Sequence, residues 1–294
     1  MKLSRILVCA GVAATLAGGL CAQVDGRTKA QLVRKKFKST NTQKEREYFL
    51  YVPVGYESEK GKRWPVILFL HGFGERGDGL SDLEKVLKHG PLMEAWVKGR
   101  DLPFLIISPQ MPGFEMPAPA KPETPRPPAA PKAGPPPLTR EAGTTPPRWG
   151  DEGPPSGWWM SEKDLLNMVD EVLREYRADP GRVYLTGLSY GGFGTWHMAA
   201  AHPNRWTAVA PMCGAGNPKT LARIAEAKVP IWIFTGGRDR LVRPEWVLAS
   251  AAELEKAGHP SVRFTVHEDL GHDVWTRVYE GLDLYNWFLA HRRE

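Results

Sequence analysis

The sequence predicts an α/β protein, a single domain in which a mostly parallel sheet is covered by helices on both faces. Short apolar runs, of the length of buried strands, alternate with longer segments whose apolar residues recur at helical spacing. Strands that alternate with helices pair in parallel, because each helix carries the chain back across the sheet. With 294 residues and 42% hydrophobic content, the chain can bury the core of one such domain.

Continuous apolar runs predict strands that are buried on both faces. The runs are 65–70, 104–108, 183–186, 207–210, 231–234 and 262–266. An earlier run, 49–52, predicts an edge strand on the antiparallel side of the sheet. Ligands of such sheets bind beyond the carboxyl ends of the strands, so the loops that follow these runs are where chemistry is expected.

Helices are expected between the strands. Ser161 and Asp164 have the spacing of a capping box, and apolar residues follow at helical spacing from 165 to 176. Pro244 predicts the start of a later helix and Gly258 its end. The apolar positions of the last helix are Val274, Val278, Leu282 and Tyr285.

The first 22 residues have the pattern of an export signal. Lys2 and Arg5 form a basic start, and an apolar run that ends near Leu20 is followed by small residues. We therefore expect a signal peptide at 1–22 and a secreted or periplasmic mature protein at 23–294. No later stretch is long and apolar enough to span a bilayer, so we expect no stable membrane insertion of the mature protein.

Two alternatives to cleavage of the signal remain. A retained anchor is disfavoured because the run is shorter than the roughly 20 apolar residues that a spanning helix needs. A lipid anchor at Cys21 is disfavoured because Leu20 is not the small residue that such processing requires. After cleavage at most Cys21 and Cys213 remain, so we expect a core rather than a disulfide framework to hold the fold together.

The formal net charge of +6 does not indicate nucleic-acid binding. The basic residues are concentrated between 29 and 46, and the rest of the chain is nearly balanced. A terminal basic segment is typical of a solvated arm, and no basic–aromatic motif accompanies it. We expect no nucleic-acid partner.

A proline-rich segment interrupts the pattern at 111–157. More than half of the 27 prolines of the chain fall in it, and periodic apolar residues are missing. Such a segment cannot bury enough surface to offset its ordering entropy, so we expect a flexible, partly polyproline insertion in one catalytic domain. Binding to a proline-recognising partner is the alternative.

The strongest chemical signal is Gly-Leu-Ser-Tyr-Gly at 187–191, directly after a predicted strand. A nucleophile at a tight strand-to-helix turn needs small neighbours two residues away on either side, and Gly187 and Gly191 supply them. The free N–H groups of the helix that follows favour negative charge. Ser189 is therefore the predicted nucleophile, with an ordinary turn serine as the alternative.

A glycine loop, 71–74, follows another predicted strand. Acyl transfer develops negative charge on a carbonyl oxygen, and two fixed N–H donors stabilise it. We expect the backbone N–H groups of Tyr190 and Phe73 to form this oxyanion hole. Gly72 and Gly74 are alternatives to Phe73, and a plain turn is the alternative to the whole assignment.

His272 is the predicted base and Asp239 the acid that orients it. In this arrangement the chain order is nucleophile, acid, histidine, and Asp239 is the acid in the loop after the strand at 231–234. Asp269 and Asp273 are alternatives, but they are near neighbours of His272. The other histidines considered as the base, and expected in strand, turn, packing or surface positions, are His267, His259, His197 and His202.

The block 182–196 resembles the nucleophile block of bacterial carboxylesterase/phospholipase-like proteins, α/β-hydrolases related to feruloyl esterases and polyhydroxybutyrate depolymerases. Shorter similar blocks are 70–72, 108–110, 230–234 and 271–275. The resemblance spans about 48 to 291, except for the insertion, and it departs from many relatives at Tyr190, where they carry methionine. It implies the α/β-hydrolase fold and ester hydrolysis without a metal or an organic cofactor.

Metal-ligand spacing is missing, since there is no H-E-x-x-H motif and no paired cysteines, and we expect no metal and no cofactor. Cys213 is expected to be a small buried hydrophobe. Trp158, Trp159 and Trp275 could line a cleft, because aromatic rings stack on sugar or phenolic rings, or they could belong to the core.

The predicted reaction is hydrolysis of short acyl or aryl esters through an acyl-enzyme, with feruloyl or acetyl esters, including polysaccharide-linked ones, as hypothetical substrates. Two alternatives are a prolyl-oligopeptidase-like serine peptidase and an inactive hydrolase-fold binding protein. Residues suited to catalysis occupy all three positions of the predicted catalytic triad, Ser189, His272 and Asp239, and this disfavours the inactive scaffold.

Overall fold

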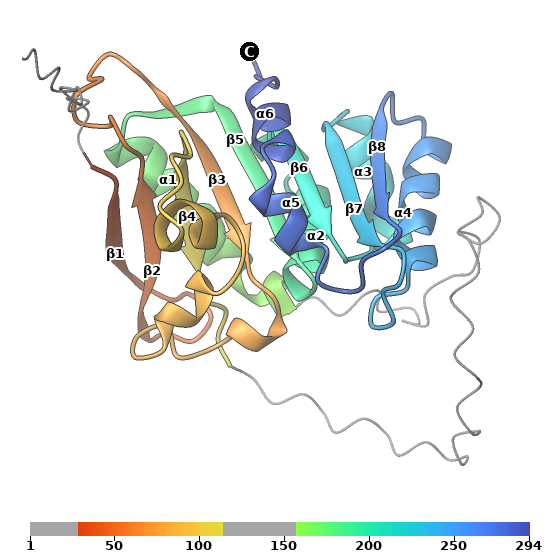
Figure 1. Ribbon diagram of the computed structural model, residues 1–294, viewed down its shortest axis with the longest axis horizontal. Coiled ribbons are helices and arrows are strands. Elements are labelled where there is room, and N and C mark those ends of the chain that lie inside the picture. Colours follow the sequence, from red (N-terminus) through yellow and green to blue (C-terminus); the bar gives the residue numbers. More distant parts are fainter. Residues whose placement is uncertain (1–28, 114–156) are drawn as a thin grey trace, which may run out of the picture.

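The computed structural model describes residues 29–113 and 157–294 (Figure 1). The expected signal peptide at 1–22 and all but the ends of the expected insertion at 111–157 lie outside the described residues. Within the described ranges, no helix is long and apolar enough to cross a membrane.

Eight strands of the described chain form one sheet in the order β1-β2-β4-β3-β5-β6-β7-β8. The strands β1 and β2 are antiparallel to each other, β2 is antiparallel to β4, and all further neighbours pair in parallel. The strands are β1 (Gln31–Lys38), β2 (Glu45–Val52), β3 (Trp64–Leu70), β4 (Leu105–Pro109), β5 (Ala178–Leu188), β6 (Ala208–Met212), β7 (Ile231–Gly236) and β8 (Val262–His267).

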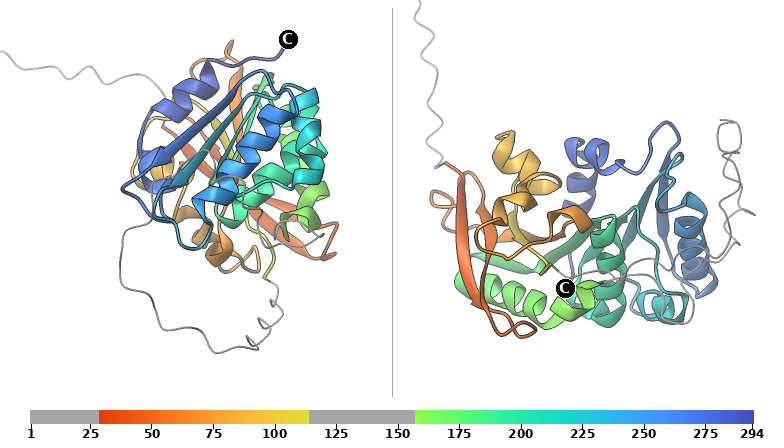
Figure 2. Two further views of the ribbon diagram at one scale, coloured as in Figure 1. Left: turned by 90° about the vertical axis from the view of Figure 1, so that its right-hand side faces the viewer. Right: turned by 90° about the horizontal axis from the view of Figure 1, so that it is seen from below.

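Helices cover both faces of this sheet, as the right-hand view of Figure 2 shows. One face carries α1 (Glu162–Glu175), α2 (Tyr190–Ala201), α3 (Pro218–Glu226) and α4 (Pro244–Lys256). The other carries α5 (Trp275–Glu280), α6 (Asp283–Leu289) and the short turns η2 (Leu83–Leu87) and η3 (Met93–Val97). The expectation of a mostly parallel sheet between helical layers is confirmed.

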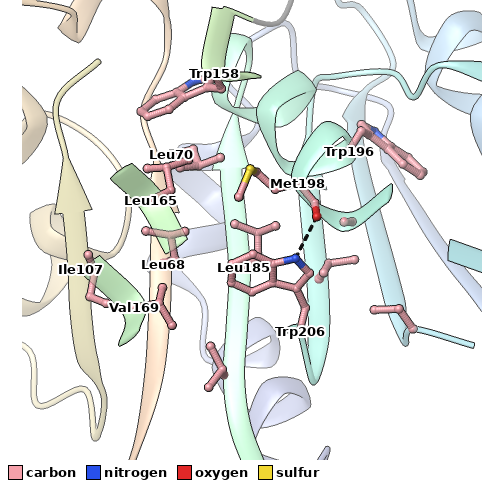
Figure 3. Close-up of a cluster of buried hydrophobic side chains, with 14 of the residues drawn as sticks. Leu68, Leu70, Ile107, Trp158, Leu165, Val169, Leu185, Trp196, Met198 and Trp206 are labelled. Atoms are coloured by element: carbon pink, nitrogen blue, oxygen red, sulfur yellow. Dashed lines mark hydrogen bonds between the residues drawn. The ribbon is translucent and has the colours of Figure 1, made fainter. Parts of the chain in front are cut away.

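The alternation of side chains along β3 explains why its whole sequence is apolar. Leu68 and Leu70 point into the core under α1 and α2, whereas Ile67 and Phe69 point into the core under α5 and α6. Figure 3 shows the first of these cores. In it Trp206 donates its indole N–H to the carbonyl oxygen of Met198 at 2.9 Å, so the buried indole is satisfied.

The strand expected at 49–52 is present on the antiparallel side of the sheet, but the prediction that it lies at the edge is wrong. These residues lie in β2, and β1 pairs outside them over its full length, with Gln31 opposite Val52 and Lys38 opposite Glu45. The segment taken as a solvated basic arm is therefore the edge strand. Charged residues interrupt its apolar alternation, but Val33 and Phe37 still pack against the core.

Acidic partners in distant elements stabilise the basic residues of β1. Lys35 Nζ lies 2.7 Å from Glu171 and 2.8 Å from Glu175, both on α1. Arg34 pairs with Glu47 on β2 at 2.8 Å. These ion pairs join the edge strand to β2 and α1. They would not be expected of a tail that extends into solvent.

The helices differ from expectation in two places. Ser161 makes no side-chain capping bond to α1, and the buried Asp164 instead accepts hydrogen bonds from Ser39 Oγ at 2.8 Å and Thr40 N at 2.7 Å. The pair is therefore not a capping box. The expected last helix is divided into α5 and α6 at Gly281, which leaves Leu282 exposed.

Candidate active site

Ser189 lies at the sharp turn between β5 and α2. Its φ of 52° and ψ of −116° are outside the usual regions for a residue with a side chain. The turn is held by hydrogen bonds from Ser189 N to the carbonyl oxygen of Met212 at 2.8 Å and from Phe193 N to that of Ser189 at 3.1 Å. A strained backbone of this kind persists only where its surroundings fix it, and it occurs often at functional sites.

The two glycines of the motif allow the close packing that forces this turn. A Cβ on Gly191 would stand 1.9 Å from the carbonyl oxygen of Leu70, the last residue of β3. A Cβ on Gly187 would stand 2.4 Å from the carbonyl oxygen of Gly191. No other residue fits at either position, because real Cβ atoms do not approach backbone oxygen so closely.

Three side chains from the carboxyl ends of β5, β7 and β8 form a hydrogen-bonded chain. His272 Nε2 lies 2.8 Å from Ser189 Oγ, and His272 Nδ1 lies 2.6 Å from Asp239 Oδ2. These loops meet because parallel strands end at the same edge of the sheet. The arrangement can transfer a proton from the serine hydroxyl to the imidazole while the carboxylate holds the ring.

Asp239 is fixed on its other side by the backbone. Its Oδ1 accepts hydrogen bonds from Leu241 N at 2.8 Å and Val242 N at 3.0 Å, and its side chain is fully buried. With Oδ2 bound to His272, both oxygens of the carboxylate have hydrogen-bond partners. A buried carboxylate is stable only with such partners.

The other candidate acids and bases lie elsewhere. Asp269 pairs with Arg277 at the surface, and this hydrogen-bonded partner lowers the pKa of Asp269 to about 2. His267 ends β8, and the ring of His259 is buried and bonded to the carbonyl oxygen of Val229 at 2.9 Å. His197 and His202 both bond to Glu162 at 2.7 Å, away from the nucleophile.

The glycine loop after β3 lies directly against the nucleophile. A Cβ on Gly72 would stand 3.8 Å from Ser189 Cβ and 2.9 Å from Leu188 Cδ1, so only glycine leaves this approach open. Phe73 begins the short turn η1 (Phe73–Glu75), and its ring packs edge-on against Tyr190 at 5.6 Å. The two residues expected to form the oxyanion hole are therefore neighbours in space.

His71 anchors this loop, a role that the sequence analysis did not assign. It is buried, its Nε2 accepts the backbone N–H of Met111 at 2.9 Å, and its Nδ1 lies 2.6 Å from the carbonyl oxygen of Gly72. Burial lowers the pKa of His71 to about 4, so the ring is neutral at pH 7 and donates from Nδ1. The spacing of the motif could indicate a loop but not these partners.

The three tryptophans considered for a cleft lie in different surroundings. Trp158 is fully buried in the core (Figure 3), so it cannot line an open cleft, and it packs edge-on against His71 at 4.9 Å. Trp159 is 59% exposed. Trp275 is largely buried, and its ring packs against that of His272 at 5.1 Å.

Cys213 is a buried thiol beside the triad, as its small size led us to expect. Its sulfur lies 3.3 Å from the carbonyl oxygen of His272, and in the described ranges Cys213, Asp239 and His272 form a cluster of donors of the kind that binds metals. The cluster does not suit a metal, because both nitrogens of His272 are already hydrogen-bonded. Burial also raises the pKa of Cys213 and disfavours the thiolate that a metal needs.

Comparison with known proteins adds sequence relatives. The model of the Dienelactone hydrolase family matches residues 158–280. A bifunctional acetylxylan esterase/xylanase of Neocallimastix patriciarum is 32% identical over 106 residues, which are 36% of this chain and 15% of that protein. A poly(3-hydroxyalkanoate) depolymerase of Paucimonas lemoignei is 47% identical over 50 residues, 17% of this chain and 12% of that protein. The chain thus spans a small part of these relatives.

Solved structures match over most of the chain. A thermostable esterase superposes with a TM-score of 0.61 at 24% identity, over 89% of this chain and 63% of the other. A ferulic acid esterase from Anaeromyces mucronatus superposes with a TM-score of 0.57 at 17% identity, over 91% and 92% of the two chains. An acylaminoacyl peptidase of Pyrococcus horikoshii gives 0.54 at 16% identity, over 90% and 41%. The expected α/β-hydrolase fold and the resemblance to esterases and depolymerases are confirmed.

Proposed function

We propose that this α/β-hydrolase chain is a serine carboxylic-ester hydrolase. The observation that carries the proposal is the unbroken hydrogen-bonded chain from Asp239 Oδ2 through both nitrogens of His272 to Ser189 Oγ. The order of the three residues in the sequence is that of α/β-hydrolases. The names of the matched esterases support the same reaction class.

The reaction has two steps. Ser189 Oγ attacks the ester carbonyl carbon while His272 Nε2 takes the hydroxyl proton, and this proton then leaves with the alcohol as the acyl-enzyme forms. Water next gives a proton to the same nitrogen and attacks the acyl carbon, and His272 returns this proton to Ser189 Oγ as the ester bond to the serine breaks and the acid leaves. Asp239 stabilises the imidazolium in both steps, and the backbone N–H groups of Phe73 and Tyr190 bind the oxyanion.

We propose short acyl or aryl esters as substrates, including acetyl or feruloyl esters linked to polysaccharide. The support for acetyl and feruloyl groups is similarity to two known proteins, an acetylxylan esterase/xylanase and a ferulic acid esterase. Export of the protein to the periplasm or the medium fits such a substrate. The support for export is the pattern of basic and apolar residues at 1–22.

Hydrolysis of p-nitrophenyl acetate, butyrate and octanoate tests the proposal. Wild-type protein should cleave the short esters, Ser189→Ala should lose this activity, and the exposed Ser261→Ala should keep it. A wild-type protein as inert as Ser189→Ala would favour an inactive scaffold.

Natural substrate and bond type need separate assays. Release of acid from acetylated and feruloylated xylan tests the substrate class, and no release from either polymer by an enzyme that cleaves simple esters would exclude it. Matched ester and amide substrates test the peptidase alternative. An esterase cleaves the ester much faster, whereas comparable turnover of the amide would favour a peptidase.

A further inference from the structure

A buried carboxyl group beside the nucleophile has no part in the two-step reaction. Glu75 ends the turn η1 and is only 7% exposed. The point that a Cβ on Gly72 would occupy lies 3.0 Å from Glu75 Oε2 and 3.8 Å from Ser189 Cβ. Because Gly72 has no side chain, nothing from this residue separates the carboxyl group from the space beside the serine.

This carboxyl group has few partners. In the described part of the chain His89 Nε2 lies 4.0 Å from Glu75 Oε1, which is longer than a hydrogen bond. No hydrogen bond to either oxygen is formed within the described ranges. Neither oxygen belongs to the fully buried polar atoms that lack a partner, so the carboxyl group keeps an opening through which a bound molecule can supply a donor.

The surroundings place Glu75 on the same side of the site as the base. The ring of His89 packs edge-on against Trp275 at 5.7 Å, and Trp275 packs edge-on against His272 at 5.1 Å. Burial is the main cause that lowers the pKa of His89, so this ring is neutral at pH 7 and does not neutralise the carboxyl group. Glu75, His89 and Trp275 thus form a series of neighbouring side chains that ends at His272.

The charges around Glu75 favour a neutral hydrogen-bond donor over a cation as its bound partner. Arg76, the next residue, places its guanidinium 3.4 Å from the centre of the Phe73 ring on the same loop. The positive charge of Arg76 on the same loop disfavours an ammonium group as the bound donor. A hydroxyl group needs only the acceptor oxygen, which Glu75 provides.

We propose that Glu75 determines specificity by accepting a hydrogen bond from a hydroxyl group of the substrate, close to the scissile ester. The inference rests on the proposed serine esterase function and names its substrate class, esters that carry a free hydroxyl. The hydroxyl can belong to the alcohol, as in a partly acylated sugar, or to the acyl group, as in a hydroxy acid. Two matched pairs of substrates distinguish these sources.

The first pair is a monoacetylated methyl xyloside and the same acetate with its other hydroxyls methylated. The second is the p-nitrophenyl esters of 3-hydroxybutyrate and butyrate. The variants are Glu75→Leu, which removes the acceptor, Glu75→Gln, which keeps the size of the side chain, and the control Glu84→Gln, an exposed acid on η2. The quantity measured is kcat/KM for each substrate, on proteins whose thermal unfolding has been checked.

Glu75→Leu should lower kcat/KM for a hydroxyl-bearing ester by roughly 10- to 100-fold, the range for loss of a hydrogen bond to a charged group. The same variant should change kcat/KM for the matched ester without a hydroxyl group by no more than about twofold. Glu75→Gln should show the same selectivity with a smaller fall, and it remains informative if the leucine variant does not fold. A fall in kcat/KM that is confined to the xyloside with free hydroxyls places the recognised hydroxyl on the alcohol. A fall that is confined to the 3-hydroxybutyrate ester places it on the acyl group.

Two results would overturn the inference while the proposed function stands. An equal fall for all four esters would mean that Glu75 only supports the loop, and no fall would mean that it has no role in recognition. If wild-type protein cleaves none of the four esters, the proposed function fails and the inference fails with it.

Discussion

Asp239 and His272 are joined by a 2.6 Å hydrogen bond between Oδ2 and Nδ1, although 33 residues separate them in the sequence. The two backbone N–H groups on Oδ1 fix the rotation of the carboxylate. The imidazole is therefore held with its proton on Nδ1, and its second nitrogen faces Ser189 as an acceptor. This orientation explains why an acid is needed at position 239 rather than any polar residue.

The first prediction concerns Asp239→Asn. Its amide oxygen would keep the two backbone donors, so its NH2 group would face Nδ1 and force the proton of His272 onto Nε2, towards Ser189. We expect kcat/KM for p-nitrophenyl butyrate to fall about 10⁴-fold, with the melting temperature little changed. Asp273→Asn should retain activity. Near wild-type turnover by Asp239→Asn would show that Asp239 does not set the tautomer.

The second prediction concerns the packing of α2 against β3. Gly191→Ala would place a methyl group 1.9 Å from the carbonyl oxygen of Leu70, which neither backbone can avoid. We expect a loss of roughly 3 kcal/mol or more in the free energy of unfolding, measured by urea denaturation. Gly61→Ala is the matched control, because nothing lies within 4 Å of its added Cβ. Equal stability of the two variants would contradict the close approach.

The third prediction concerns the thiol of Cys213. It is fully buried and its pKa is raised by burial, so the thiolate that reacts with iodoacetamide is scarce in the folded protein. Wild type and Cys213→Ala should take up the same number of labels under native conditions, as counted by intact mass. Wild type should take up one more after denaturation. Labelling of Cys213 in the folded protein would mean that the triad region opens readily.

The fourth prediction concerns Glu162, which joins His197 and His202. Burial acts to raise the pKa of Glu162, but the hydrogen bonds from His202 and His197 outweigh it, and the pKa is lowered from the ordinary value of 4.5. A lowered pKa in the folded state stabilises the protein above the unfolded-state pKa, and this contribution disappears as the pH falls. Glu162→Gln should therefore be less stable than wild type near neutral pH.

Urea midpoints of wild type and Glu162→Gln should converge only below about pH 4.5, as the pH falls from the ordinary pKa of glutamate to the lowered pKa of folded Glu162. The exposed Glu268→Gln is the control and should follow wild type at every pH. A difference between wild type and Glu162→Gln that does not change with pH would show that the charge of Glu162 contributes nothing.

The nucleophile turn could be predicted from sequence because its determinants are local. Gly187, Ser189 and Gly191 lie within five residues, between an apolar strand and a helix of small residues. The chain order then indicated which loops would supply the acid and the base. The structure brings these residues together, while their catalytic roles stay predictions until activity is measured.

Features that depend on distant partners could not be predicted. The edge strand β1 is rich in charge, and its stability depends on Glu47, Glu171 and Glu175 in other elements. Asp164 has the spacing of a capping residue, but it accepts a hydrogen bond from Ser39, which lies 125 positions earlier in the sequence. Periodicity likewise could not separate the adjacent Trp158 and Trp159, of which one is buried and the other exposed.

Covalent labelling of Ser189 by a fluorophosphonate tests the central claim most directly, because only a serine activated by its base displaces fluoride rapidly. The account predicts one phosphonate adduct per molecule, mapped to the peptide that contains Ser189, absent from Ser189→Ala and present in Ser261→Ala. A wild-type protein that forms no adduct, or an adduct that persists in Ser189→Ala, would contradict it.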